Sequence, residues 1–332
     1  MPSKIILLTG HRKSGTSMLH RLFDGHPGVN NYPVDISLYG LFTENNKLKN
    51  IKDIKKRFEL IIKTSFRHLE GKKIFDYDEK FNSSNFLKVF WSICPHYKIL
   101  SSSNTINRGF IILSLAKAWE MYAKLNITLP MVLKETSLSI FCNEIKSIIK
   151  NLKVIQIIRD PRDNYAAIKE GITKYYNAVL GEGEKETLAS VINRSRMDLI
   201  TGLELTKSSK SFFKIIKFED LCKNPTMHLK KISNFCGIPF DITLLKPTIF
   251  GKDYYGNNHK GKKMIGISQE NIGRWKHRIS KFEAGVIEYW LGDIMDKLNY
   301  KKKIKSEYSM DCFSTFYQWY NYKYFYYDSF KN

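Results

Sequence analysis

The start of the chain constrains the fold most, because an apolar run, a glycine-containing loop and a helical pattern follow one another within 25 residues. The apolar run Ile5-Ile6-Leu7-Leu8 predicts a buried parallel strand. Residues 14–23 then place apolar side chains at helical spacing, namely Met18, Leu19, Leu22 and Phe23. A strand, a loop and a helix in this order begin a βαβ unit, so we expect an α/β protein.

The loop Gly10-His11-Arg12-Lys13-Ser14-Gly15-Thr16-Ser17 has the glycine spacing of a phosphate-binding P-loop. Backbone N–H groups at a helix N-terminus can hold a phosphate there. A nucleoside-triphosphate P-loop has lysine directly after its second glycine, but this chain has Thr16 there and its lysine at Lys13. The loop therefore indicates a phosphate without a triphosphate tail. Hydroxyl groups of Thr16 and Ser17 would donate to it, and Lys13 would stabilise charge on a leaving group.

Further strands and helices alternate along the chain. Strands are predicted at Lys153–Ile158 and Phe212–Phe218, and helices start near 162, 187, 219 and 281. This alternation predicts a central, doubly wound parallel sheet with flanking helices, a P-loop-like three-layer architecture. Residues 45–128 indicate a mostly helical insertion, which could form a lid or an acceptor site.

Arg159 gives a second signal for anion binding. It follows the predicted strand 153–158 and precedes Pro161, which favours the start of a helix. Ligands of such sheets bind at the carboxyl ends of the strands, and a guanidinium can grip a phosphate with two N–H groups. The alternative is a structural salt bridge between Arg159 and a carboxylate.

Several of these segments resemble the sulfotransferases that use 3′-phosphoadenosine 5′-phosphosulfate (PAPS). The run Arg12–Ser17 resembles their 5′-phosphosulfate loop, and Arg159-Asp160-Pro161-Arg162-Asp163 is similar to their segment for the donor's 3′-phosphate. Phe218-Glu219-Asp220-Leu221 resembles a Tyr-Glu-Asp-Leu segment near the adenine, and Gly273-Arg274-Trp275-Lys276 one whose basic residues cap the phosphates. The resemblance does not extend to the insertion at 45–128 or to the tail after residue 300.

The resemblance implies a single sulfotransferase domain over residues 1–300, with PAPS as co-substrate and no metal. The donor site that it implies consists of Arg12, Lys13, Ser14, Gly15, Thr16, Ser17, Arg159, Phe218 and Arg274. One departure concerns Ala167, which stands where the family usually has a serine on the 3′-phosphate. Lys169 or a basic residue nearer the C-terminus is a candidate to compensate.

Three residues are expected to carry the catalysis. Lys13 would stabilise the leaving phosphate, and the resemblance implies that Lys134, at a strand-to-helix turn, contacts the transferring sulfonate. For the general base we favour Asp35, since related enzymes carry a glutamate in this region. His96, His259 and Glu135 remain alternatives.

The charge and cysteine content bear on partners and location. The 54 Lys and Arg against 32 Asp and Glu give a formal net charge of +22, which fits nucleic acid, an anionic membrane or polysaccharide, or simply an AT-rich coding genome. The lysines are dispersed, so no specific nucleic acid is expected. Five cysteines without a CxxC pair, and no secretory or membrane-spanning segment, predict a cytoplasmic protein.

The aromatic and lysine-rich tail at 301–332 predicts either a docked helix or a surface for sugars or peripheral membrane contact. For the whole chain we expect transfer of a sulfuryl group from PAPS to a hydroxyl or amine, with a carbohydrate, an anionic glycan or a glycolipid as acceptor. The alternatives are a P-loop small-molecule kinase and a basic polyanion-binding protein with a decayed donor site.

Overall fold

The computed structural model describes residues 4–38, 53–74, 79–93, 108–172, 183–256, 263–264 and 266–321. In these parts of the chain five strands pair in parallel in the order β2-β3-β1-β4-β5. The strands are β1 (Ile5–Thr9), β2 (Asn30–Asp35), β3 (Met131–Lys134), β4 (Leu152–Ile158) and β5 (Phe213–Lys217). The predicted parallel sheet is confirmed, and β2 and β3 are strands that the sequence patterns did not identify.

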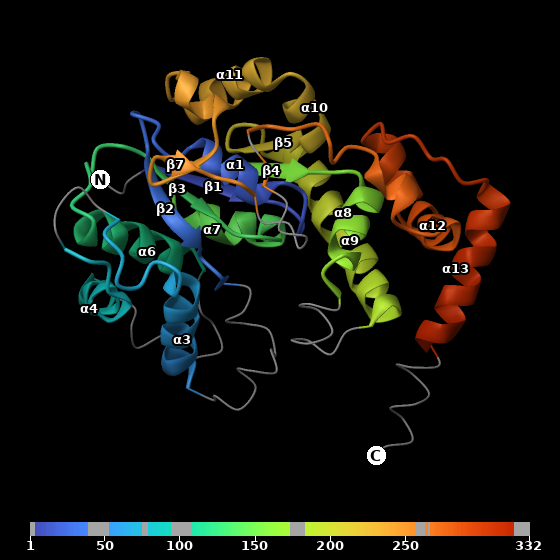
Figure 1. Cartoon of the computed structure of the whole chain (residues 1–332), viewed down its shortest axis with the longest axis horizontal. Helices are drawn as coiled ribbons and strands as arrows, with labels where there is room; N and C mark the ends of the chain where they lie inside the picture. The colour runs from blue at the N-terminus through green and yellow to red at the C-terminus, as the bar shows by residue number, and fades with distance from the viewer. Residues whose placement is uncertain are drawn as a thin grey trace.

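Helices cover both faces of the sheet and create three layers (Figure 1). On β1, Ile6 and Leu8 face one cluster and Ile5 and Leu7 face the other, as the two-residue period of a strand requires. The first cluster contains residues of α1 (Thr16–Leu22), α10 (Phe218–Lys223) and α11 (Pro225–Cys236). The second contains residues of α6 (Arg108–Tyr122), α7 (Cys142–Ile148) and the end of α9 (Glu184–Ser208).

The described part of the insertion is mostly helical, as predicted. It contains α3 (Ile54–Phe66), α4 (Ser83–Ile93) and α6, which pack beside β2 through a cluster of aromatic rings. Tyr32 of β2 meets the rings of Phe66 and Trp119 edge-on, with centroids 5.7 and 5.8 Å apart. Trp119 also donates a hydrogen bond from Nε1 to the carbonyl oxygen of Asn31, at 3.1 Å. The insertion is therefore joined to the sheet by a shared core.

The C-terminal part forms two packed helices, α12 (Lys281–Lys297) and α13 (Ser306–Asn321). Helix α12 begins with a capping box between Ser280 and Glu283. From α13, Cys312 and Phe316 are buried in the same cluster as α12 and α9, so this segment is a docked helix. Within the ranges given above, no helix is both long enough and apolar enough to cross a membrane. Membrane contact through residues 301–332 stays a prediction, and residues 322–332 lie outside the described parts.

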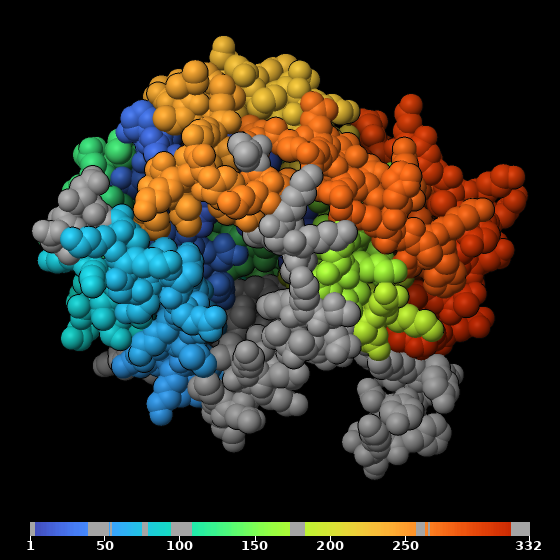
Figure 2. Space-filling view, viewed as in Figure 1, coloured from blue at the N-terminus to red at the C-terminus, as the bar shows by residue number. Residues whose placement is uncertain are grey.

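Helix α8 (Pro161–Lys169) and a small hairpin complete the frame of the site. The hairpin pairs β6 (Thr248–Ile249) with β7 (Lys252–Asp253). It is attached to the end of α1, because Asp24 accepts hydrogen bonds from Thr248 Oγ1 at 2.7 Å and from the Gly251 N–H at 3.1 Å. In Figure 2 the orange residues of this part of the chain lie across the middle of the face shown, beside the blue N-terminal residues.

Candidate functional site

The loop after β1 has a backbone that only certain residues adopt without strain. Gly10 and Gly15 have φ values of 149° and 103°, and Lys13 has a left-handed φ of 63°. A Cβ atom on Gly15 would lie 2.6 Å from Cδ2 of Phe218, and one on Gly10 would lie 2.1 Å from the Ile157 carbonyl oxygen. Both glycines therefore let the loop lie directly against β4 and Phe218.

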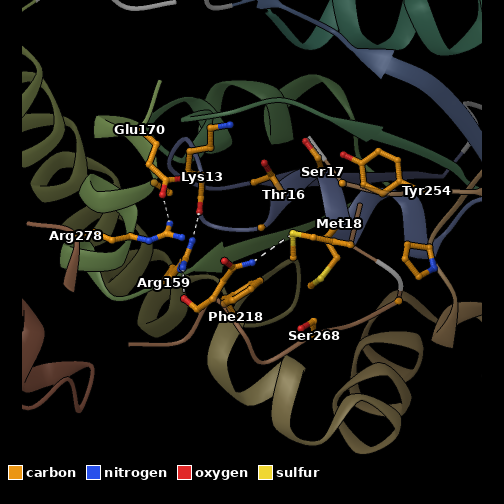
Figure 3. Close-up of a pocket in the computed structure, with 17 residues that line it drawn as sticks. Lys13, Thr16, Ser17, Met18, Arg159, Glu170, Phe218, Tyr254, Ser268 and Arg278 are labelled. Carbon is orange, nitrogen blue, oxygen red and sulfur yellow. Dashed lines mark hydrogen bonds and ion pairs between the residues drawn. The ribbon is translucent and has the colours of Figure 1, made fainter. Parts of the chain in front are cut away.

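A pocket opens at the carboxyl ends of β1, β4 and β5, where ligands of parallel sheets bind (Figure 3). The loop, the end of β4 and the end of β5 contribute Lys13, Gly15, Thr16, Ser17, Arg159 and Phe218. Helix α8 adds Ala167, with Glu170 directly after it, and the C-terminal part adds Pro247, Tyr254, Asn271 and Arg278, among others. Six of the predicted site residues thus line one cavity.

Arg159 is held in the pocket by backbone carbonyls. Its guanidinium donates a 3.1 Å hydrogen bond to the carbonyl oxygen of Lys13 and another to that of Asn271. It also lies over the Phe218 ring, 4.9 Å from the centroid. The side chain is therefore fixed against the loop, and its direct hydrogen bonds go to carbonyls, not to the carboxylate of the alternative prediction.

The rest of the Arg-Asp-Pro-Arg-Asp run holds the surrounding structure in place. Asp160 caps α8 and pairs with Arg162, which also forms an ion pair with Glu288 of α12. Asp163 accepts hydrogen bonds from the N–H groups of Gly273 and Trp275, at 2.7 and 2.8 Å. Burial raises the pKa of Asp163, although the charge of Arg159 and these two N–H groups lower it. The motif therefore fixes α8, α12 and the 273–275 segment around Arg159.

Lys134, Asp35 and Ser17 form a connected group, of which Ser17 lines the pocket whereas Asp35 and Lys134 do not. The Lys134 Nζ lies 2.5 Å from Oδ1 of Asp35 and donates a 3.4 Å hydrogen bond to Ser17 Oγ. Lys134 is buried, whereas the Asp35 side chain is 49% exposed. Burial lowers the pKa of Lys13, and the nearby charge of Lys134 lowers it further. The structure thus brings the two predicted cations and the predicted base into one region.

Of the three alternative bases, only Glu135 lies among the described residues. Glu135 is buried, and its carboxylate accepts the backbone N–H of Thr136 at 2.7 Å. Burial, together with the charge of Asp35, raises the pKa of Glu135 to about 7. It does not line the pocket described above. His96 and His259 lie outside the described residues.

Four other predicted side chains are not among those that line the pocket. Arg12 donates to Ser190 Oγ at 3.4 Å, and Ser14 donates to the carbonyl oxygen of His11. Arg274 donates to Asn271 Oδ1 at 2.8 Å. Lys169 pairs with Glu283 at 2.9 Å, so it does not supply the contact that Ala167 lacks.

Sequence reasoning missed Tyr254, Glu170 and Arg278 among the lining residues. Among the described residues of the C-terminal part, Arg278 is the basic one that lines the pocket, and its guanidinium is 2.6 Å from Oε1 of Glu170. Glu170 stands three residues after Ala167, so the helical period places both on one face, and this signal was available in the sequence. Among the described residues, no three His, Cys, Asp or Glu side chains are grouped closely enough to hold a metal ion.

The fold and the pocket define an α/β protein with a modified P-loop and cationic side chains at the carboxyl edge of its sheet. Residues 6–242 match the model of the sulfotransferase family. The chain belongs to this family, as the sequence motifs indicated.

The chain is also similar to curated sulfotransferases. The chain is 26% identical to carbohydrate sulfotransferase 1 of Rattus norvegicus over 187 residues, which is 50% of this chain and 44% of the relative. For the Homo sapiens protein of that name the identity is 26% over 181 residues, or 48% and 42% of the two chains. The matched region spans less than half the length of these relatives.

Solved structures share the fold. The sulfotransferase domain of the Synechococcus olefin synthase superposes with a TM-score of 0.57 at 16% identity, covering 90% of this chain and 96% of that domain. The sulfotransferase domain of the curacin biosynthetic pathway gives 0.58 at 17% identity, covering 91% and 99%. At these identities the likeness shows the three-layer fold alone.

Proposed function

We propose that the protein transfers a sulfuryl group from PAPS to a hydroxyl or amine of a carbohydrate acceptor. The observation that carries this proposal is that Lys13, Arg159 and Phe218 line one and the same pocket, against a loop turned by two glycines. In this arrangement the loop N–H groups and the hydroxyl groups of Thr16 and Ser17 hold the 5′-phosphosulfate. Arg159 binds the 3′-phosphate, and Phe218 packs on the adenine.

The chemical step needs a base and positive charge on the leaving oxygen. Asp35 takes the proton of the acceptor as its oxygen or nitrogen attacks sulfur, and the bond from sulfur to the bridging phosphate oxygen breaks. Lys13 stabilises the phosphate that leaves. Lys134, which pairs with Asp35 and Ser17, neutralises the sulfonate oxygens during transfer.

The carbohydrate class of the acceptor is supported by the carbohydrate sulfotransferases that the chain resembles. The net charge of +22 favours an anionic glycan or glycolipid among these acceptors. We place the protein in the cytoplasm, which suits the buried free thiols of Cys142, Cys222, Cys236 and Cys312.

The donor site is tested by calorimetric titration with adenosine 3′,5′-bisphosphate without metal, against ATP with Mg²⁺. We expect binding of the bisphosphate, weakened about 10-fold or more by Lys13→Ala and by Arg159→Ala, since each removes a phosphate-binding charge. Lys207→Ala removes an exposed lysine of α9 and serves as the matched control. A preference for ATP with Mg²⁺ would favour the kinase alternative, and no nucleotide binding would favour the polyanion-binding one. Bisphosphate binding would justify an acceptor screen with PAPS.

A further inference from the structure

The pocket proposed for a doubly phosphorylated nucleotide contains a carboxylate. Glu170, directly after α8, lines it together with Ala167. Its carboxylate and the Arg278 guanidinium form a 2.6 Å ion pair, and the two side chains are only 17% and 16% exposed. A negative charge at this depth opposes an incoming phosphate, because solvent screens it poorly.

Glu170 acts on more than one cation of the pocket. Burial lowers the pKa of Lys13, and the charge of Glu170 opposes this change. Burial also lowers the pKa of Arg278, Glu170 again opposes it, and the charges of Arg274 and Arg159 lower it further. Figure 3 shows Glu170 beside Lys13, with its carboxylate joined to Arg278. The carboxylate therefore balances positive charges that would otherwise repel one another.

We propose that Glu170 is an internal counter-ion that competes with the nucleotide's phosphates for Arg278 and Lys13. This inference rests on the proposed function, because it assumes that a phosphorylated nucleotide enters the pocket. On binding, the phosphate oxygens take over N–H donors of Arg278, and the carboxylate of Glu170 loses its partner. The competition lowers the affinity for the donor PAPS and for the product adenosine 3′,5′-bisphosphate. It also makes the affinity depend on the number of phosphates that the ligand carries.

The test is Glu170→Gln, which keeps the size of the side chain and one oxygen acceptor and removes the charge. We expect the Kd of adenosine 3′,5′-bisphosphate to fall about 10-fold, that of adenosine 5′-monophosphate to fall less, and that of adenosine to stay unchanged. Glu204→Gln on α9 removes the same charge from an exposed position outside the pocket and should change none of the three. Unchanged binding of adenosine also shows that the Glu170→Gln protein is folded.

Other results would overturn the inference. If Glu170→Gln weakens bisphosphate binding as Arg278→Met does, Glu170 positions Arg278 and does not compete with phosphate. If Glu170→Gln raises the affinity for all three ligands equally, or by no more than Glu204→Gln does, competition between Glu170 and phosphate is also excluded. If the wild-type protein binds no bisphosphate at all, the proposed function fails and the inference fails with it. If the wild-type protein binds the bisphosphate but the gain in affinity on Glu170→Gln does not rise with the number of phosphates, only this inference is overturned and the proposed function stands.

Discussion

Lys13 has a left-handed backbone, which costs a residue with a Cβ atom about 1 kcal/mol relative to glycine. That conformation turns the carbonyl oxygen of Lys13 toward Arg159, which donates a hydrogen bond to it. The side chain of the same residue lines the pocket. One strained residue thus contributes a carbonyl that holds Arg159 and a side chain that the proposed function assigns to the leaving group, so its strain is offset by two interactions.

Glu135 makes stability depend on pH. Its folded pKa of about 7 lies above the ordinary value of 4.5, so between these values the folded protein keeps a proton that the unfolded chain releases. The stabilising effect of this proton is complete below pH 4.5 and is lost as the pH rises to 7. We therefore expect Glu135→Gln to gain stability over wild type across this range, by up to about 3 kcal/mol. Urea unfolding at pH 4.5, 6 and 8 measures it, and a difference independent of pH would contradict it.

Helix α8 positions the C-terminal half of the pocket through one side chain. The carboxylate of Asp163 binds two successive N–H groups of the 273–275 segment, which leads to Arg278. We expect Asp163→Ala to lower the free energy of unfolding by about 2 kcal/mol and to weaken bisphosphate binding about 10-fold, because Arg278 loses its support.

Calorimetry and limited proteolysis measure the effect of Asp163→Ala, with new cleavage expected within 266–278. Asp293→Ala removes an exposed carboxylate of α12 that pairs with Arg196 and should leave bisphosphate binding unchanged. The role given to Asp163 would be wrong if its loss changed neither binding nor cleavage.

The sequence patterns identified elements whose apolar run is continuous and missed those whose run is short or interrupted. Strand β4 was predicted within one residue, because all but one of its seven residues are buried. Strand β2 contains Asn30, Asn31 and Pro33, and its register to β3 shifts between Asn31 and Asp35. Proline lacks the N–H of a central strand, so an edge position tolerates it, and no alternation is visible in the sequence.

Site residues that belong to a sequence motif were predicted, and those outside a motif were missed. Lys13 and Arg159 were found because each belongs to a motif that a strand carries into the pocket. Arg274 was predicted because it belongs to the Gly-Arg-Trp-Lys segment, whereas Arg278 lies beyond that segment and was not considered. The short 3₁₀ helix Arg274–His277 separates the two, and Arg278 is the one that lines the pocket. The position of this segment depends on the hydrogen bonds that Asp163 accepts from Gly273 and Trp275. Asp163 lies far away in sequence, so a local pattern could not reveal that Arg278 enters the pocket.

At the scale of the molecule, α13 is a part of the body although it follows the region of family resemblance. Phe316 is 4% exposed, whereas its neighbour Tyr317 is 49% exposed. We expect Phe316→Ala to lower the free energy of unfolding by about 3 kcal/mol and Tyr317→Ala by less than about 1 kcal/mol. Neither should alter the Kd of the bisphosphate, because the described pocket has no residue from α13.

Thermal and chemical unfolding of the two variants measure the difference. Equal effects of Phe316→Ala and Tyr317→Ala would mean that α13 is only loosely attached.

The position of β1 in the middle of the sheet has a consequence for biosynthesis. Its two neighbours are β3 and β4, which begin at Met131 and Leu152. A growing chain therefore carries the apolar run Ile5–Leu8, with both edges open, until β3 and β4 have left the ribosome. Pairing over such sequence separations is slow, and exposed strands of this kind associate with other chains. The nascent protein should thus depend on chaperones that shield β1.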